Sequence, residues 1–122
     1  LSPDPGILRL TKTMLNKSII DANLTIRAFA VQFGVDMESM EAGDRVKIPA
    51  TYADGTACTL SFYLTANRGD KRFSCSGLKA RADVGDLVAL TTRTGPDGSV
   101  ALVVNVSAAA GDLVSRALQA TA

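Results

Sequence analysis

Apolar and polar residues alternate along much of the chain after residue 43, and a period of two is typical of half-buried β-strands. The clearest apolar row consists of Cys58, Leu60, Phe62, Leu64, Phe73 and Cys75. Turn signals lie at Asp54-Gly55, at 67–70 and at 95–98. We therefore expect residues 57–65 and 71–78 to pair as a hairpin with one face on the core.

A helical pattern precedes these strands. Four apolar residues have the spacing of one buried helix face, namely Ile26, Phe29, Ala30 and Phe33. The alternation of Phe29, Val31, Phe33 and Val35 would also allow a strand. Asn23 as an N-cap and Gly34 as a left-handed C-terminal residue favour the helix.

The other segments complete a mainly β architecture. Short strands are expected at 7–10, 45–49, 86–92 and 100–106, and Pro49 favours an edge position for the second of them. Residues 11–20 fit either a helix or a strand, and residues 111–120 fit a helix. The predicted fold class is α+β, mainly β. It is an open pseudobarrel of about five to seven short, mostly antiparallel strands with one or two helices near the N-terminus and a possible C-terminal helix.

The chain has 122 residues, of which 47% are hydrophobic and 20% are charged, which fits one folded domain. We expect a flexible lead-in at 1–6, one domain at 7–106, and a C-terminal helix or linker at 107–122. The opening Leu1 suggests a piece of a longer protein. No apolar run approaches the ~18 residues of a membrane span, so no membrane partner is expected.

Two absences limit the chemistry. The sequence holds no His, the commonest general base and metal ligand, and its two cysteines cannot form a four-ligand zinc site. Ser76 and Lys79 match an S-x-x-K acylase motif, but its partner motifs are missing. We therefore expect a binding domain without enzymatic activity, metal or cofactor.

Both cysteines lie on the apolar face of the predicted hairpin. A turn near residue 68 places Cys58 opposite about residue 78, so Cys58 and Cys75 are not directly paired. We expect buried free thiols rather than a disulfide. Free thiols are typical of a reducing compartment, which predicts a cytoplasmic location.

Basic residues form two clusters although the net charge is only +1. One cluster spans residues 9–27 and the other spans residues 68–81, each with a single acidic residue. Hydroxyl and basic residues also share the polar face of the hairpin: Thr59, Ser61, Tyr63, Thr65, Arg72, Ser74 and Ser76. This pattern fits contacts to phosphates and base edges, or an ordinary solvated strand face.

The order of these features resembles the B3-type pseudobarrel DNA-recognition domain of plant transcription factors and bacterial restriction endonucleases. The resemblance spans residues 7–106 and includes Leu10-Thr11-Lys12-Thr13, the basic hairpin turn, Gly77-Leu78-Lys79 and Val84-Gly85-Asp86. It implies sequence-specific binding of double-stranded DNA in the major groove, as the target-recognition part of a larger restriction-type endonuclease. The alternative is a non-catalytic protein-interaction or structural β-barrel domain.

The resemblance also implies two DNA-binding arms. The first arm would comprise Arg9, Thr11, Lys12, Thr13, Asn16 and Lys17. The second arm would comprise Tyr63, Thr65, Asn67, Arg68, Lys71 and Arg72, with Lys79 as a further contact. The arms coincide with the two basic clusters that the charge pattern shows.

Overall fold

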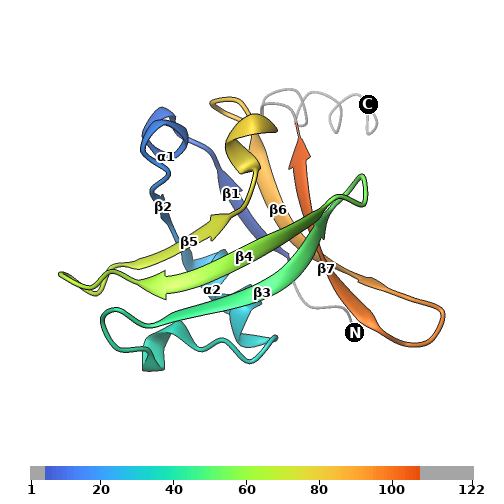
Figure 1. Ribbon diagram of the computed structural model, residues 1–122, viewed down its shortest axis with the longest axis horizontal. Coiled ribbons are helices and arrows are strands. Elements are labelled where there is room, and N and C mark those ends of the chain that lie inside the picture. Colours follow the sequence, from blue (N-terminus) through green and yellow to red (C-terminus); the bar gives the residue numbers. More distant parts are fainter. Residues whose placement is uncertain (1–4, 108–122) are drawn as a thin grey trace, which may run out of the picture.

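The computed structural model describes residues 5–107 (Figure 1). Its elements are β1 (Gly6–Arg9), α1 (Lys12–Lys17), β2 (Ile20–Asp21), α2 (Leu24–Val31), the 3₁₀ helix η1 (Met37–Ser39), β3 (Arg45–Tyr52), β4 (Ala57–Leu64), β5 (Lys71–Cys75), the 3₁₀ helix η2 (Leu78–Ala80), β6 (Leu87–Thr94) and β7 (Val100–Ser107). The expected helix at 111–120 lies outside the described residues, as do the first four residues of the expected lead-in.

The strands form one sheet in the order β1-β6-β7-β3-β4-β5-β2. Every neighbouring pair is antiparallel except β3 and β7, which pair in parallel only at Thr51–Val103 and Tyr52–Val104. From this short junction the two parts of the sheet diverge and curl into a half-barrel (Figure 1). The predicted mainly β fold class is therefore confirmed.

The junction also explains Pro49. Because β3 pairs with β7 only from Thr51, the earlier residues of β3 lie at an open edge on that side. Proline lacks the N–H that an inner strand would donate, so an edge position is the one it tolerates. The predicted edge position is confirmed.

The core lies inside the curl of the sheet. The predicted apolar row of β4 and β5 is buried, and Phe62 and Phe73 stack with ring centroids 6.2 Å apart. Helix α2 packs against β1 with Ile26 and Phe29 inward. Gly6 allows β1 and α2 to approach closely because it has no side chain. A Cβ at this position would lie only 3.1 Å from the Ile26 side chain and 3.2 Å from the Ile26 Cα.

The capping signals that predicted α2 are confirmed. The Asn23 side chain accepts a 3.0 Å hydrogen bond from the Ile26 N–H at the start of the helix. Beyond its end, Gly34 has a φ of +82°, and the Val35 N–H donates to the Ala30 carbonyl across 3.1 Å. A left-handed glycine with this hydrogen bond is a common way for a helix to stop.

The ambiguous segment 11–20 begins as helix α1 and leads to β2, which starts at Ile20. The Thr11 hydroxyl accepts from the Met14 N–H and caps the helix, and Leu15 anchors it in the core. Ser18 adopts a left-handed φ of 54° and ends it. Among residues 5–107, no helix is long and apolar enough to cross a membrane.

Candidate nucleic-acid interface

The first predicted arm is an exposed basic edge formed by β1 and α1. Leu15 holds α1 against the core, and the six predicted contact residues lie in solvent: Arg9, Thr11, Lys12, Thr13, Asn16 and Lys17. Within residues 5–107, no carboxylate oxygen lies within 4.0 Å of the charged nitrogens of the two lysines or Arg9. These cations are therefore available to an anionic ligand.

Lys79 extends the first arm rather than the hairpin turn. It lies in η2, and a shallow cavity of about 160 Å³ separates η2 from α1. Leu15 and Ser18 line one side of this cavity, and Ser74 and Lys79 line the other. The structure thus brings Lys79 near α1, although 62 positions separate it from Lys17 in the sequence.

The second predicted arm is a well-braced turn between β4 and β5. The Thr65 N–H donates to the Asp70 carbonyl across 3.0 Å, and the Asp70 N–H donates to the Thr65 hydroxyl across 2.9 Å. The Gly69 N–H donates to the Thr65 carbonyl, and Gly69 has a left-handed φ of +69°. Asn67 and Arg68 project from this turn, and 82% of the Arg68 side chain is exposed.

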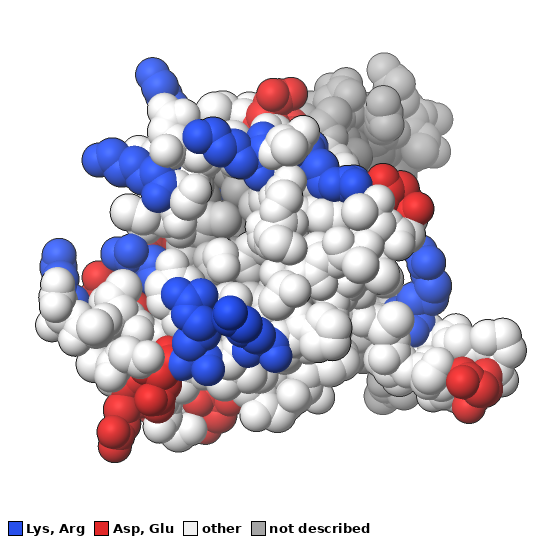
Figure 2. Space-filling model, viewed as in Figure 1, with Lys and Arg blue, Asp and Glu red and all other residues white. Residues whose placement is uncertain are grey.

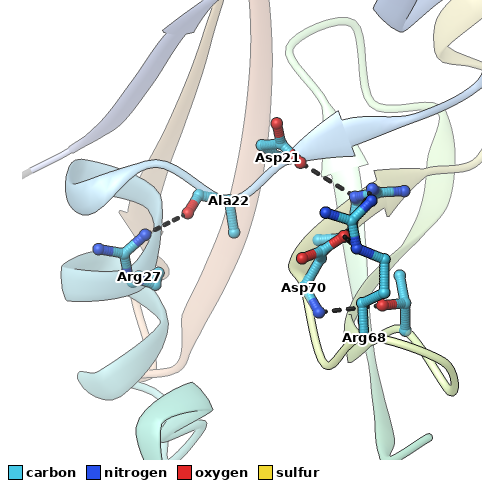
Figure 3. Close-up of polar contacts among 7 residues, drawn as sticks. Asp21, Ala22, Arg27, Arg68 and Asp70 are labelled. Carbon is cyan, nitrogen blue, oxygen red and sulfur yellow. Dashed lines mark hydrogen bonds and ion pairs between the residues drawn. The ribbon is translucent and has the colours of Figure 1, made fainter. Parts of the chain in front are cut away.

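Arg72 has a different environment from Arg68. Its Nε donates to an Asp21 carboxylate oxygen across 2.9 Å, and its Nη2 donates to an Asp70 carboxylate oxygen across 3.2 Å. Only 20% of its side chain is exposed. The Arg68 Nε lies 4.0 Å from the same Asp70 oxygen (Figure 3), yet most of the Arg68 side chain is exposed. Arg72 therefore positions the turn, whereas Arg68 remains open to a ligand.

Lys71 also has an acidic neighbour. Its Nζ lies 3.5 Å from a carboxylate oxygen of Glu38 in η1, and the Arg27 Nε lies 3.6 Å from the other oxygen. The Arg27 Nη1 donates to the Ala22 carbonyl across 2.6 Å (Figure 3). The four cations Arg27, Arg68, Lys71 and Arg72 line a hollow beside β2, together with Asp21 and Asp70. Charge at this arm is thus largely compensated.

Tyr63 is covered by an arginine that the sequence analysis did not assign. The guanidinium carbon of Arg45 lies 4.1 Å from the centre of the Tyr63 ring, in cation–π geometry. The register pairs Arg45 with Tyr63, Tyr63 with Arg72, and Arg72 with Asp21, so one row crosses four strands. Alternation in β3 places Lys47 on the same face. The alternation of polar and apolar residues in β3 was the sequence signal that could have placed Arg45 and Lys47 on this face.

The hydroxyl residues of this outer face are partly used within the protein. The Ser76 hydroxyl accepts from the Thr59 N–H across 2.9 Å, and Ser61 is buried. The Tyr52 hydroxyl donates to the Ser76 carbonyl across 2.6 Å from the core side. These contacts tie the residue that follows β5 to β3 and β4.

The two cysteines lie in the core next to Tyr52. The register puts Cys75 opposite Leu60, so Cys58 is displaced from it along β4, and both are buried free thiols, as expected. The Cys75 thiol donates to the Tyr52 hydroxyl across 3.3 Å. Burial raises the pKa of Cys75 to about 12 and also raises the pKa of Cys58. Both thiols are therefore protonated at neutral pH and poor nucleophiles.

An exposed ion pair borders this cluster. The Arg81 guanidinium stacks on the Tyr52 ring at 4.1 Å and lies 2.9 Å from an Asp54 carboxylate oxygen. The Thr56 backbone N–H and then Arg81 lower the pKa of Asp54 to about 2. Across residues 5–107, no group of three or more His, Cys, Asp or Glu residues is arranged to hold a metal.

Figure 2 shows how charge is distributed on the outer face of the sheet. Lys and Arg side chains gather over α1 and η2 along the upper edge and over β3 at the lower centre, with an uncharged, hollowed surface between them. Acidic side chains gather at the lower left, over residues 36–44. The basic residues thus frame one face instead of being scattered evenly.

The candidate site therefore consists of basic projections on a mainly β half-barrel. Comparisons of the chain with protein-family models, curated proteins and solved structures found no match. The resemblance to B3-type domains accordingly remains a prediction.

Proposed function

We propose that this domain binds double-stranded DNA through two arms, α1 with η2 and the β4–β5 turn. The observation that carries the proposal is the placement of exposed, uncompensated cations on the first arm and of exposed Arg68 on a braced turn. Figure 1 shows α1 and the turn projecting from the same side of the molecule, with β2 between them. The hollows that adjoin the two arms both include residues of β2.

The two arms have different chemistry. Lysine carries a compact charge on a flexible chain, so Lys12, Lys17 and Lys79 suit phosphate oxygens. Arg68 carries a planar group with parallel N–H donors, which match the O6 and N7 edge of guanine in the major groove. The first arm thus supplies affinity and orientation, and the turn supplies sequence preference.

The wider role follows from the resemblance to B3-type domains. We propose that the domain is the target-recognition part of a larger restriction-type endonuclease and that the cleavage activity belongs to another part of that enzyme. The cytoplasm is the proposed location, because reducing conditions keep thiols such as Cys58 and Cys75 free.

A protein-interaction domain is the second candidate, and one observation favours it. An apolar groove of about 330 Å³ runs between the open edge of β3 and the start of β7, lined by Ile48, Pro49, Val100 and Leu102. Val100 is 58% exposed. An exposed apolar groove at an open strand edge fits a protein ligand better than DNA.

Binding of a fluorescent mixed-sequence duplex at low salt tests the first candidate. We expect the Lys12→Ala/Lys17→Ala double variant to bind more weakly than the wild type. Arg93→Ala is the control for the loss of an exposed positive charge outside both arms, because Arg93 is exposed on β6. Equal binding by all three proteins would contradict the assignment of the first arm, and no duplex binding by the wild type would favour the second candidate.

A further inference from the structure

The outer face of β3 carries two cations that neither arm includes. Arg45 and Lys47 are exposed, and no carboxylate oxygen of residues 5–107 lies within 4.0 Å of their charged nitrogens. Figure 2 shows Lys and Arg side chains over β3, and Arg45 and Lys47 are the basic residues of this strand. Two uncompensated cations on one face of a strand suit an anionic ligand.

Tyr63 orients the first of these cations. The Arg45 guanidinium carbon lies 4.1 Å from the centre of the Tyr63 ring, so the ring holds the guanidinium over β4. A guanidinium held in this way loses less conformational entropy when it binds than a free one. Its N–H fork matches two oxygens of one phosphate group.

The register connects this pair of cations to the first arm. Lys47 lies opposite Ser61, and Ser61 lies opposite Ser74, so a polar row crosses from β3 to β5. Ser74 also lines the cavity between α1 and Lys79. The polar row therefore leads from Lys47 to the basic edge that α1 and η2 form.

Two aspartates of the sheet and its loops are already neutralised by ion pairs. Asp21 pairs with Arg72, and Asp54 pairs with Arg81, each at 2.9 Å. A phosphate backbone that follows the polar row from β3 to η2 would therefore meet the two uncompensated cations of β3 and then Lys79. Neither Asp21 nor Asp54 would present an unpaired negative charge to it.

We propose that Arg45 and Lys47, with Tyr63 as the residue that positions Arg45, form a third contact surface for the DNA phosphate backbone. The duplex would cross the outer face of β3–β4–β5 as well as contacting the two arms. This proposal rests on the proposed function and extends it. Phosphate contacts do not depend on sequence, so the surface would lengthen the bound segment and strengthen binding to every duplex.

The salt dependence of binding to a mixed-sequence duplex tests the proposal. The slope of log K against log[salt] is negative, and each lost phosphate contact decreases its magnitude by about one unit. We expect this decrease for Arg45→Ala and for Lys47→Ala, with no decrease for the control Arg93→Ala. Arg45→Lys should retain most of the slope, because it keeps the charge, and should bind more weakly than the wild type, because it loses the stacked fork.

The possible outcomes separate this surface from the proposed function. If Lys17→Ala lowers the slope but Arg45→Ala and Lys47→Ala do not, the third surface is wrong and DNA binding by the first arm stands. If Arg93→Ala lowers the slope equally, binding depends on overall charge and the third surface is again wrong. If the wild type binds no duplex, both proposals fail. If these substitutions of exposed residues leave the urea denaturation midpoint unchanged, the differences in salt slope arise from DNA binding and not from unfolding.

Discussion

Arg72 and Asp21 are separated by 51 residues in the sequence, yet the Arg72 Nε donates a 2.9 Å hydrogen bond to the Asp21 carboxylate. This contact joins β5 to β2, which has only two residues and two backbone pairings. The same guanidinium reaches Asp70 in the β4–β5 turn. One side chain thus fixes the edge strand and the turn from which Arg68 projects.

We predict that Arg72→Ala lowers the free energy of unfolding by roughly 1 kcal/mol, because two charge-assisted hydrogen bonds are lost at a site only partly open to water. Arg68→Ala should change it by less than about 0.5 kcal/mol, since its side chain is almost fully exposed. Urea denaturation of both variants measures the difference. Equal denaturation midpoints would contradict the structural role of Arg72.

Recognition of bases should depend on Arg68. We predict that Arg68→Ala costs about 1–3 kcal/mol on the preferred site and relaxes the preference at one base pair. Lys71→Ala should weaken binding less than Arg68→Ala and about equally on all sequences, because Glu38 already lies 3.5 Å from the Lys71 Nζ. Competition on a randomised duplex library compares each variant with the wild type. If both substitutions cause the same loss on every sequence, the turn contacts DNA without reading bases.

The buried thiols give a prediction that does not depend on DNA. Cys58 and Cys75 should react slowly with a thiol reagent in the native protein, because both are buried and protonated at neutral pH. After denaturation without reductant, both cysteines of the chain should react rapidly. Rapid reaction of the native protein would show that the strands open readily, and fewer than two reactive thiols after denaturation would indicate a disulfide.

Stability should also decrease in alkali. Burial raises the pKa of Cys75 from 9.0 to about 12 in the folded protein, so the unfolded chain loses this proton at a lower pH. The resulting stabilisation is complete below about pH 9 and is lost as the pH rises towards 12, at no more than about 1.4 kcal/mol per pH unit for one group. Cys75→Ala should make the decrease in the free energy of unfolding shallower between these pH values. An identical slope in the variant would contradict the burial of this thiol.

The sequence predicted the elements that local patterns determine. The β4–β5 hairpin follows from strict alternation and turn residues. Helix α2 follows from the apolar face of Ile26, Phe29 and Ala30, whereas Phe33, the fourth residue expected on this face, lies beyond the end of the helix and is partly buried against the core. Helix α1 stayed ambiguous because six residues contain fewer than two turns, too few to distinguish periods of two and 3.6.

The candidate site was less predictable because its charges are paired between distant segments. Glu38 lies near Lys71, and Asp21 lies near Arg72, only after the sheet has curled and β2 has joined its edge. Arg45 lies over Tyr63 because of the register between β3 and β4, which no motif in the sequence specifies. Basic clusters in the sequence therefore located the arms but did not distinguish free cations from compensated ones.

The central claim is that exposed cations of the two arms bind a DNA duplex, with those of the first arm in contact with its phosphates. Its most direct test is the affinity of the wild-type protein for a duplex across a series of salt concentrations. Four phosphate contacts, from Arg9, Lys12, Lys17 and Lys79, predict a slope of log K against log[salt] of about −3 to −4, and steeper if Arg45 and Lys47 also contact phosphates. A flat salt response, or no duplex binding at low salt, would contradict the account.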